Sequence, residues 1–322
     1  MATSILTNET VAAMPQLDIN RRLRSRSALR VRERIIKPLL FLCVLSSVAT
    51  TGTTSVFLSI EAFSVFRMDG VSFVEFFTTS QWNPLLGEEK HFGVWSLISG
   101  TMLVTVVAMA LALPLGLVTA VYMSEYAPRR LRSILKPTLE VLAGIPTVVY
   151  GFFALTVITP ALKMFHEGFN IYNAFSAGIA VGILCLPTVS SLAEDALQAV
   201  PRSLREAAYA LGATKFDVSV KVVLPAALSG IVSAFLLAIA RAIGETMIVA
   251  LAAGSMPRLT IDAREEVQTM TGFMVQMALG DVSNFGPEYS SMYAVAATLF
   301  LMTFTLTVIG GQVRRRFREA YT

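Results

Sequence analysis

Arg241 and Glu245 are the two residues of this sequence whose types and spacing most strongly suggest chemistry. They lie in the stretch ARAIGETMIV, inside an apolar run over 228–253 that otherwise contains nothing more polar than serine and threonine. A planar guanidinium offers paired donors that match the oxygens of an oxyanion, and a carboxylate accepts hydrogen bonds. The pair therefore suggests recognition or gating of a charged solute.

The depth of the pair follows from helix geometry. Along a continuous helix that starts at Pro225, Arg241 lies roughly 24 Å from the start and Glu245 about 6 Å further. An i, i+4 spacing places both on one face, and a charge that faces lipid at this depth costs at least a few kcal/mol. Three roles stay open: a structural bridge, a gate whose members change partners, and direct contact with a passing anion. Thr246 adds a hydroxyl beside the pair.

A second polar element lies in the apolar stretch EVLAGIPTVVYG. Pro146 falls about 14 Å beyond Pro137 along a helix, near the middle of a bilayer. Thr147 and Tyr150 follow on the next turn. Proline in a membrane helix frees a carbonyl and bends the axis. Either this kink serves packing alone, or Thr147 and Tyr150 line the wall of a pathway.

The composition sets the class of protein that holds these groups. Hydrophobic residues make up 54% of the 322 residues and charged residues 15%, whereas a soluble protein carries about 25% charged residues. The apolar runs are continuous rather than alternating, which excludes a β-barrel and predicts an all-α transmembrane fold. Six runs are long enough to cross a membrane as helices: 38–60, 94–123, 138–160, 174–193, 227–252 and 291–312.

The basic residues predict the orientation of these spans. Twenty of the 26 lysine and arginine residues fall before the first span, in two alternate connections or after the last span. The positive-inside rule then places both termini in the cytoplasm. This topology explains the net charge of +4 better than a nucleic-acid partner does. Residues 1–37 form a basic segment that we expect to be disordered, or a frayed helix on anionic lipid headgroups.

The remaining domain boundaries follow from the same pattern. Residues 38–93 hold the first span and an outside loop, 94–312 form a core with five spans, and 313–322 form a basic tail. The loop 61–93 is rich in aromatic residues, and we expect part of them to form an interfacial belt and the rest to pack as a small outside cap. The loop 254–290 is the longest outside segment. It carries the carboxylates of Asp262, Glu265, Glu266, Asp281 and Glu288.

Several kinds of chemistry are not indicated by the sequence. Cys43 and Cys185 lie within spans, and His91 and His166 lie in outside loops, so these residues predict neither a disulfide framework nor a metal site. The sequence has no G-x-x-x-x-G-K-[ST] segment and no nucleophile–base set. We therefore expect no cofactor and no catalysis in this chain, and ATP and Mg²⁺ on a separate chain if transport is active.

The connection between the fourth and fifth spans predicts a short cytoplasmic helix. Pro201 suits the first turn, residues 202–211 have good helix propensity, and Gly212 suits a left-handed C-terminal cap. Thr214 followed by Asp217 is typical of the start of another short helix.

The surface of the predicted helix is suited to a partner. The small side chains of Ala207 and Ala208 leave the helix surface nearly flat. Arg205 and Glu206 are expected to remain free for charged contacts. Such a helix fits a groove on another protein, and the alternative is an amphipathic helix lying on the membrane.

This helix and its surroundings resemble the EAA motif of ABC importer permeases. The sequence has EAAYALG, then nine residues, then VVLP. The resemblance implies a six-helix MetI-like permease with a cytoplasmic coupling helix between spans four and five that docks on a separate ATP-binding subunit. Val222 replaces the commoner isoleucine of the motif. The motif positions are Glu206, Ala207, Ala208, Gly212, Val222, Leu224 and Pro225.

Longer stretches narrow this resemblance. SEYAPRRLRSILKPTLEVLAGIPTVVYGFF and ARAIGETMIV are similar to the permeases of the bacterial phosphate-specific (Pst) importer, PstC and PstA. The continuation GETM and the stretch FFTTSQWNP…FGVWSLISGT favour the PstC type. The resemblance covers about residues 73–312. It implies a bacterial inner-membrane location, a second permease, two ATP-binding subunits and an outside phosphate-binding protein, with inorganic phosphate as the substrate.

The expected function is therefore that of one half of the translocation pathway of an ATP-driven phosphate importer. Phosphate near neutral pH carries a hydroxyl donor that sulfate lacks, so the carboxylate of Glu245 offers a basis for choosing phosphate. One alternative is a permease for another oxyanion or small solute, which would share the coupling helix. The other is a stand-alone channel or secondary carrier, which would transport without nucleotide.

Overall fold

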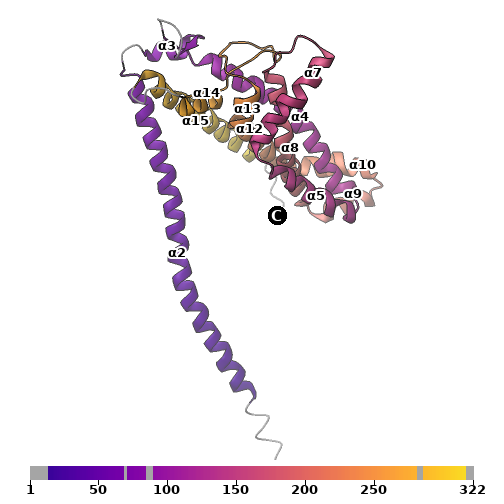
Figure 1. The fold of residues 1–322 in the computed structure, drawn as a ribbon. Helices are drawn as coiled ribbons and strands as arrows, with labels where there is room; N and C mark the ends of the chain where they lie inside the picture. Colours follow the sequence, from indigo (N-terminus) through magenta and orange to yellow (C-terminus); the bar gives the residue numbers. More distant parts are fainter. Residues whose placement is uncertain (1–13, 69–70, 85–89, 281–285, 317–322) are drawn as a thin grey trace, which may run out of the picture. The chain divides into compact units, whose positions relative to one another are not determined.

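The computed structural model describes residues 14–68, 71–84, 90–280 and 286–316, which are mostly helical (Figure 1). The chain divides into two compact units, Met1–Leu58 and Ser59–Thr322. Within the described ranges, five helices are long and apolar enough to cross a membrane, or six if one bent pair counts as a span. The expected all-α transmembrane class is confirmed. The five are Ile36–Val65, Trp95–Tyr126, Thr147–Phe165, Ala174–Gln198 and Pro287–Val313, and the bent pair is Lys215–Ala226 with Leu228–Ile243.

Helix α2 (Met14–Val65) extends well beyond the predicted first span of 38–60. Residues 14–37 are helical rather than disordered, because no glycine or proline lies between Pro15 and Pro38 and the stretch is rich in arginine and leucine. Residues 1–13 of the predicted basic segment lie outside the described residues.

The centre of the second unit is the pair α4 (Trp95–Val121) and α8 (Ala174–Gln198). These helices approach closely because their shared face is built from small residues. A Cβ atom added at Gly178 would lie 2.6 Å from Cβ of Val107, and one at Gly116 would lie 2.6 Å from Cγ1 of Val189. The π-helical turn η1 (Tyr122–Tyr126) continues α4.

The third span starts later than the sequence predicts. Helix α5 (Arg129–Ala143) has no buried residue and is separate from α6 (Thr147–Phe153), which continues through η2 (Ala154–Ile158) and α7 (Thr159–Phe165). Pro146 is the N-cap residue of α6. The prediction that Pro146 lies in the middle of the span is therefore wrong, because proline fits a helix start better than a helix interior.

The fifth span is also broken. After α9 (Arg202–Ala210), the chain forms α10 (Lys215–Asp217), η3 (Val218–Val223) and α11 (Leu224–Ala226). It then bends by 69° into α12 (Leu228–Ile243) and breaks again before α13 (Met247–Ala252). The predicted continuous span over 227–252 is therefore wrong. In Figure 1, α5, α9 and α10 lie together at one end of the second unit, away from α3.

Part of the aromatic loop packs as a small cap, as expected from the sequence. Its elements are α3 (Phe73–Thr78), β1 (Trp82–Asn83) and β2 (His91–Phe92), with β1 and β2 antiparallel. The Trp82 ring is buried and meets the Phe273 ring edge to face, with centroids 4.9 Å apart. Phe273 belongs to α14 (Met270–Leu279), whose first residues are buried.

The loop 254–290 is not wholly irregular. Its second half folds back as α14 because Met270, Phe273 and Met277 are apolar and pack against the cap. Helix α15 (Pro287–Arg316) begins before the predicted residue 291, so Glu288 lies in its first turn. The predicted carboxylate of Asp281 lies outside the described residues.

Candidate functional site

Arg241 and Glu245 flank the break between α12 and α13. Helix α12 ends at Ile243, Gly244 follows with φ −87° and ψ 2°, and α13 begins at Met247. Glycine and threonine have low helix propensity, which accounts for a break in the stretch GET. The prediction that the two charged residues share one face of a continuous helix is wrong, because the interruption lies between them.

The two side chains have different partners. Nη1 of Arg241 donates to Oγ1 of Thr188 at 3.1 Å, and the arginine is exposed. Glu245 is only 8% exposed, and its Oε1 accepts a hydrogen bond from the backbone N–H of Ile248 at 3.3 Å. Across the described part of the chain, Arg241 and Glu245 form no ion pair. The structural bridge is therefore not formed here, and the gate and the anion contact remain as roles for the pair.

A buried hydroxyl holds the break in place. Oγ1 of Thr271, at the start of α14, donates to the backbone carbonyl of Glu245 at 2.6 Å. Oγ1 of Thr246 donates to the carbonyl of Gly244 at 3.2 Å. Non-helical backbone within a membrane helix needs such substitute partners, because lipid offers none. The interrupted segment is thus supported by its neighbours rather than frayed.

Helix α6 lies beside this break. A Cβ atom added at Gly151 would lie 2.9 Å from Cδ1 of Leu251 and 3.2 Å from Cα of Ile248, so α6 and α13 are in close contact. Tyr150 is buried, and its hydroxyl donates to the carbonyl of Leu142 at 2.9 Å, which ties α6 to the end of α5. The structure thus brings the second predicted element, including partly exposed Thr147, next to the first.

The exposed position of Arg241 limits what this site can be. Arg241 and Gly244 both lie on the surface of this chain, although they are flanked by apolar membrane helices. A guanidinium in such a place must face a partner protein or an aqueous path rather than lipid. Its donors beyond the bond to Thr188 suit an oxyanion, because a guanidinium carries five N–H groups in a planar fork.

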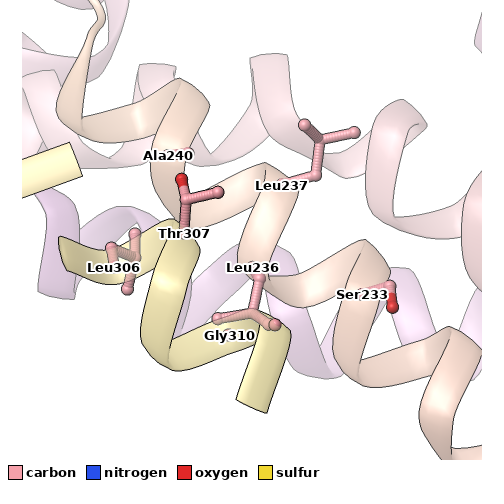
Figure 2. A pocket seen from close by; sticks show the side chains of 8 residues that line it. Ser233, Leu236, Leu237, Ala240, Leu306, Thr307 and Gly310 are labelled. Atoms are coloured by element: carbon pink, nitrogen blue, oxygen red, sulfur yellow. The ribbon is translucent and has the colours of Figure 1, made fainter. Parts of the chain in front are cut away.

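A groove between α12 and α15 has a different character (Figure 2). It has a volume of about 320 Å³, and none of its eight lining residues is charged. Leu236 and Leu237 come from α12, and Leu306 and Gly310 come from α15. The groove therefore offers no counter-charge for an anion and is not the candidate pathway.

The predicted coupling helix is confirmed as a helix with the expected caps. It is α9, and Gly212 after it has φ +81°, in the left-handed region that favours glycine. Oγ1 of Thr214 accepts from the N–H of Asp217 at 3.2 Å, as predicted for the next helix start. Glu206 and Ala207 are exposed, whereas Ala208 is partly buried against the core. One face of α9 is therefore free for a partner.

Arg205 is not free, contrary to the sequence-based expectation. Its Nη1 donates to the carbonyl of Val200 at 2.6 Å, and its Nη2 donates to the carbonyl of Leu197 at 2.8 Å. Nη2 also pairs with Oε1 of Glu125 at 3.0 Å. The last carbonyls of a helix lack helical partners and attract cations, which explains why the arginine turns back to the end of α8.

A second charged cluster was not identified from the sequence. The Glu194 side chain is fully buried on α8 and pairs with Nε of Arg132 at 2.7 Å and with Nζ of Lys136 at 3.4 Å, both from α5. Lys136 also contacts Oδ1 of Asp195 at 3.0 Å. This bond raises the pKa of Lys136, and the charge of Glu194 adds to the effect against the opposing effect of burial. The i, i+4 spacing of the two basic residues was the available signal.

The two clusters border one cavity at the α9 end of the second unit. It has a volume of about 390 Å³ and is lined by residues of the η1 turn and of α5, α8 and α9. The lining residues are Ser124, Glu125, Arg132, Gln198, Arg202, Arg205, Glu206 and Tyr209.

Residues 112–319 match the family described as "Binding-protein-dependent transport system inner membrane component". The chain belongs to this family of ABC importer permeases. It is 33% identical over 267 residues to the probable ABC transporter permease protein YqgH of Bacillus subtilis, covering 83% of this chain and 86% of that protein. It is 31% identical over 263 residues to the phosphate transport system permease protein PstC of Xylella fastidiosa, covering 76% and 78%. The corresponding protein of Mesorhizobium japonicum is 32% identical over 257 residues, covering 73% and 76%.

Solved structures show the same fold. An inward-facing structure of the MetNI methionine ABC transporter aligns with a TM-score of 0.53 at 19% identity, over 70% of this chain and 95% of that one. A bacterial ABC transporter involved in the import of alginate aligns with a TM-score of 0.61 at 14% identity, over 89% and 97%. The expected MetI-like permease fold is confirmed. ABC importer permeases are not themselves enzymes, and they work with a partner permease, an ATPase and a substrate-binding protein.

Proposed function

We propose that this chain is the PstC-type half of the translocation pathway of an ATP-driven importer of inorganic phosphate. The relatives named as phosphate permeases, at about 31% identity over three quarters of the chain, support phosphate as the substrate. The structural observation that carries the proposal is the exposed Arg241 beside a break in a membrane helix. Such breaks in transport proteins place charged groups and free backbone groups along a solute path.

Arg241 has the role of a phosphate contact or gate group in this proposal. A guanidinium that is held by one bond to Thr188 keeps further donors for phosphate oxygens. Glu245 has two functions: Oε1 supports the start of α13 through Ile248, and the carboxylate accepts from the phosphate hydroxyl. Thr246, Thr147 and Tyr150 complete the pathway wall as accessory groups.

The two ends of the second unit then have different partners. The α9 end lies in the cytoplasm, with both chain termini, and α9 docks on one of two PstB-like ATP-binding subunits that hold ATP and Mg²⁺. Glu206, Ala207, Ala208 and Gly212 form the docking helix, and Leu224 and Pro225 connect it to α12. The exposure of Glu206 and Ala207 supports this docking.

The remaining partners belong to the membrane and the outside. A PstA-like second permease covers the surface that carries Arg241 and Gly244, which supplies the protein partner that this charge requires. A PstS-like phosphate-binding protein meets the cap formed by α3, β1 and β2 and the carboxylate-bearing segment around Asp262. The protein thus resides in the bacterial inner membrane as one of two permease subunits.

The test is the ATPase activity of the complex co-purified with its neighbouring subunits in lipid. We expect the phosphate-loaded binding protein to stimulate ATP hydrolysis. Ala207→Glu should abolish this stimulation, because a long charged side chain replaces a methyl group on the docking surface of α9. Ala207→Ser is the matched control and should retain it. Stimulation by a sulfate-loaded binding protein and not by the phosphate-loaded one would favour another oxyanion, and indifference to Ala207→Glu would exclude docking through α9.

A further inference from the structure

We propose that Glu194 is a positioning residue of the transport cycle, whose buried carboxylate clamps α5 to α8 and so transmits movement of the coupling helix to the break beside Arg241. This inference rests on the proposed function, because it concerns how ATP-driven displacement of α9 reaches the pathway. Glu194 belongs neither to the EAA-type helix nor to the pathway residues.

The clamp adds a buried charged contact to a helix that contributes no fully buried residue. Helix α5 has no buried residue, yet it runs along α8. Glu194 is 0% exposed and receives Nε of Arg132 at 2.7 Å, Nζ of Lys136 at 3.4 Å and Nε2 of Gln198 at 2.8 Å. The fully buried attachment of α5 is therefore a charge pair, beside three leucines of this helix that are only partly buried.

The cost of burying this carboxylate argues for a role beyond stability. A buried ion pair contributes little net stability compared with well-packed apolar residues, because both charges lose water. In the part of the chain that the structure describes, Oε2 of Glu194 accepts no hydrogen bond and relies on the charge of Lys136. Such a pair contributes little to stability. It is better suited to fix one arrangement of two helices, and this arrangement can be exchanged for another during transport.

The coupling helix is tied to the same block. Arg205 of α9 donates to the carbonyls of Leu197 and Val200 at the end of α8, within one turn or two of Glu194, and pairs with Glu125 after α4. The cavity of about 390 Å³ borders both Arg132 and Arg205. A displacement of α9 therefore acts on the end of α8, and the adjoining space allows the charged side chains to move.

The far side of α5 leads to the pathway. The carbonyl of Leu142 near the end of α5 accepts from the hydroxyl of Tyr150 on α6, across the non-helical residues that join the two helices. Helix α6 then contacts α13 at Gly151, beside the break that Glu245 and Arg241 flank. The contacts form a continuous chain from α9 through α8, α5 and α6 to the break, and Glu194 is its only buried carboxylate among the described residues of these helices.

Contiguity alone does not establish coupling, so the experiment measures coupling itself. Phosphate uptake and ATP hydrolysis are measured on the same proteoliposomes containing the complete complex, and the result is the number of ATP molecules hydrolysed per phosphate. Glu194→Gln keeps the shape and the hydrogen-bond partner Gln198 but removes the charge. We expect this ratio to rise by about 5-fold or more, the size of an ordinary coupling energy, while ATP hydrolysis stays within about 2-fold of wild type.

Matched variants separate coupling from simple damage. Asp195→Asn alters the neighbouring exposed carboxylate that also pairs with Lys136, and it should leave the ratio unchanged. Arg132→Gln, at a partly exposed position, should reproduce the effect of Glu194→Gln if the buried variant fails to assemble, and Arg132→Lys should restore most of the coupling. The double variant Glu194→Gln with Arg132→Gln should be no worse than either single variant, because both remove the same interaction.

The outcomes distinguish this inference from the function on which it rests. An unchanged ratio in both Glu194→Gln and Arg132→Gln, in a complex that imports phosphate normally, overturns the clamp alone. Equal losses of uptake and hydrolysis in both variants also overturn it, because they indicate a merely structural role. A wild-type complex that imports no phosphate overturns the proposed function and the inference together.

Discussion

The hydroxyl of Thr271 provides a sharp test of how the break between α12 and α13 is held. This side chain is 4% exposed, and its Oγ1 donates to the carbonyl of Glu245 at 2.6 Å. Thr271→Val keeps the shape and removes the donor. A buried carbonyl left without its donor costs about 1–3 kcal/mol, which corresponds to a fall of on the order of 2–8 °C in the midpoint of thermal unfolding for a chain of this size.

The assay compares wild type, Thr271→Val and Thr271→Ser in the same detergent or nanodisc. We expect the valine variant to melt lower and to transport more slowly, because the start of α13 loses a fixed point next to Arg241. The serine variant keeps the hydroxyl and should lie within about 1 kcal/mol of wild type, since only a methyl group is lost. A valine variant that melts with the wild type, or a serine variant that melts as low as valine, would refute the assignment of this hydrogen bond.

Three further predictions follow from other contacts. Gly151→Ala should destabilise the protein by about 1–3 kcal/mol through overpacking against Leu251, measured by thermal unfolding, and an unchanged midpoint would contradict the contact between α6 and α13. The hydrogen bonds from Arg264 lower the pKa of Asp262 from 3.8 to about 2. The stabilisation by this pair is therefore present above pH 4 and is lost as the pH falls toward 2. Carboxyl NMR should show the low pKa in wild type and a return of the pKa toward 3.8 in Arg264→Gln. Glu245→Gln should reduce phosphate uptake and the discrimination against sulfate, and unchanged values for both would remove Glu245 from substrate selection.

Local chemistry made the α9 region predictable from the sequence. The helix, the left-handed cap at Gly212 and the start signal at Thr214 all depend on residues within one or two turns of each other. The apolar runs were equally clear because membrane thickness sets their length. Averaged hydropathy could not locate the breaks before Thr147 and after Ile243, because each break spans only a few residues and apolar residues lie on both sides of it.

Tertiary contacts account for what the sequence did not reveal. Glu194 appeared as one polar residue near the end of a span, and only the fold brings Arg132 and Lys136 to it from another helix. The buried start of α14 was hidden in a long connection because its anchor, the Trp82 ring, lies far away in the chain. The roles of Arg241 and Glu245 depend on a face that a second subunit is proposed to cover, so they remain predictions.

The most direct test of the account is the uptake of labelled phosphate into proteoliposomes that contain the complete complex, with ATP on the α9 side. We expect accumulation that requires ATP hydrolysis, depends on the phosphate-binding protein and persists in excess sulfate. Uptake that proceeds without nucleotide and follows an ion gradient, or that sulfate suppresses as effectively as unlabelled phosphate, would contradict it.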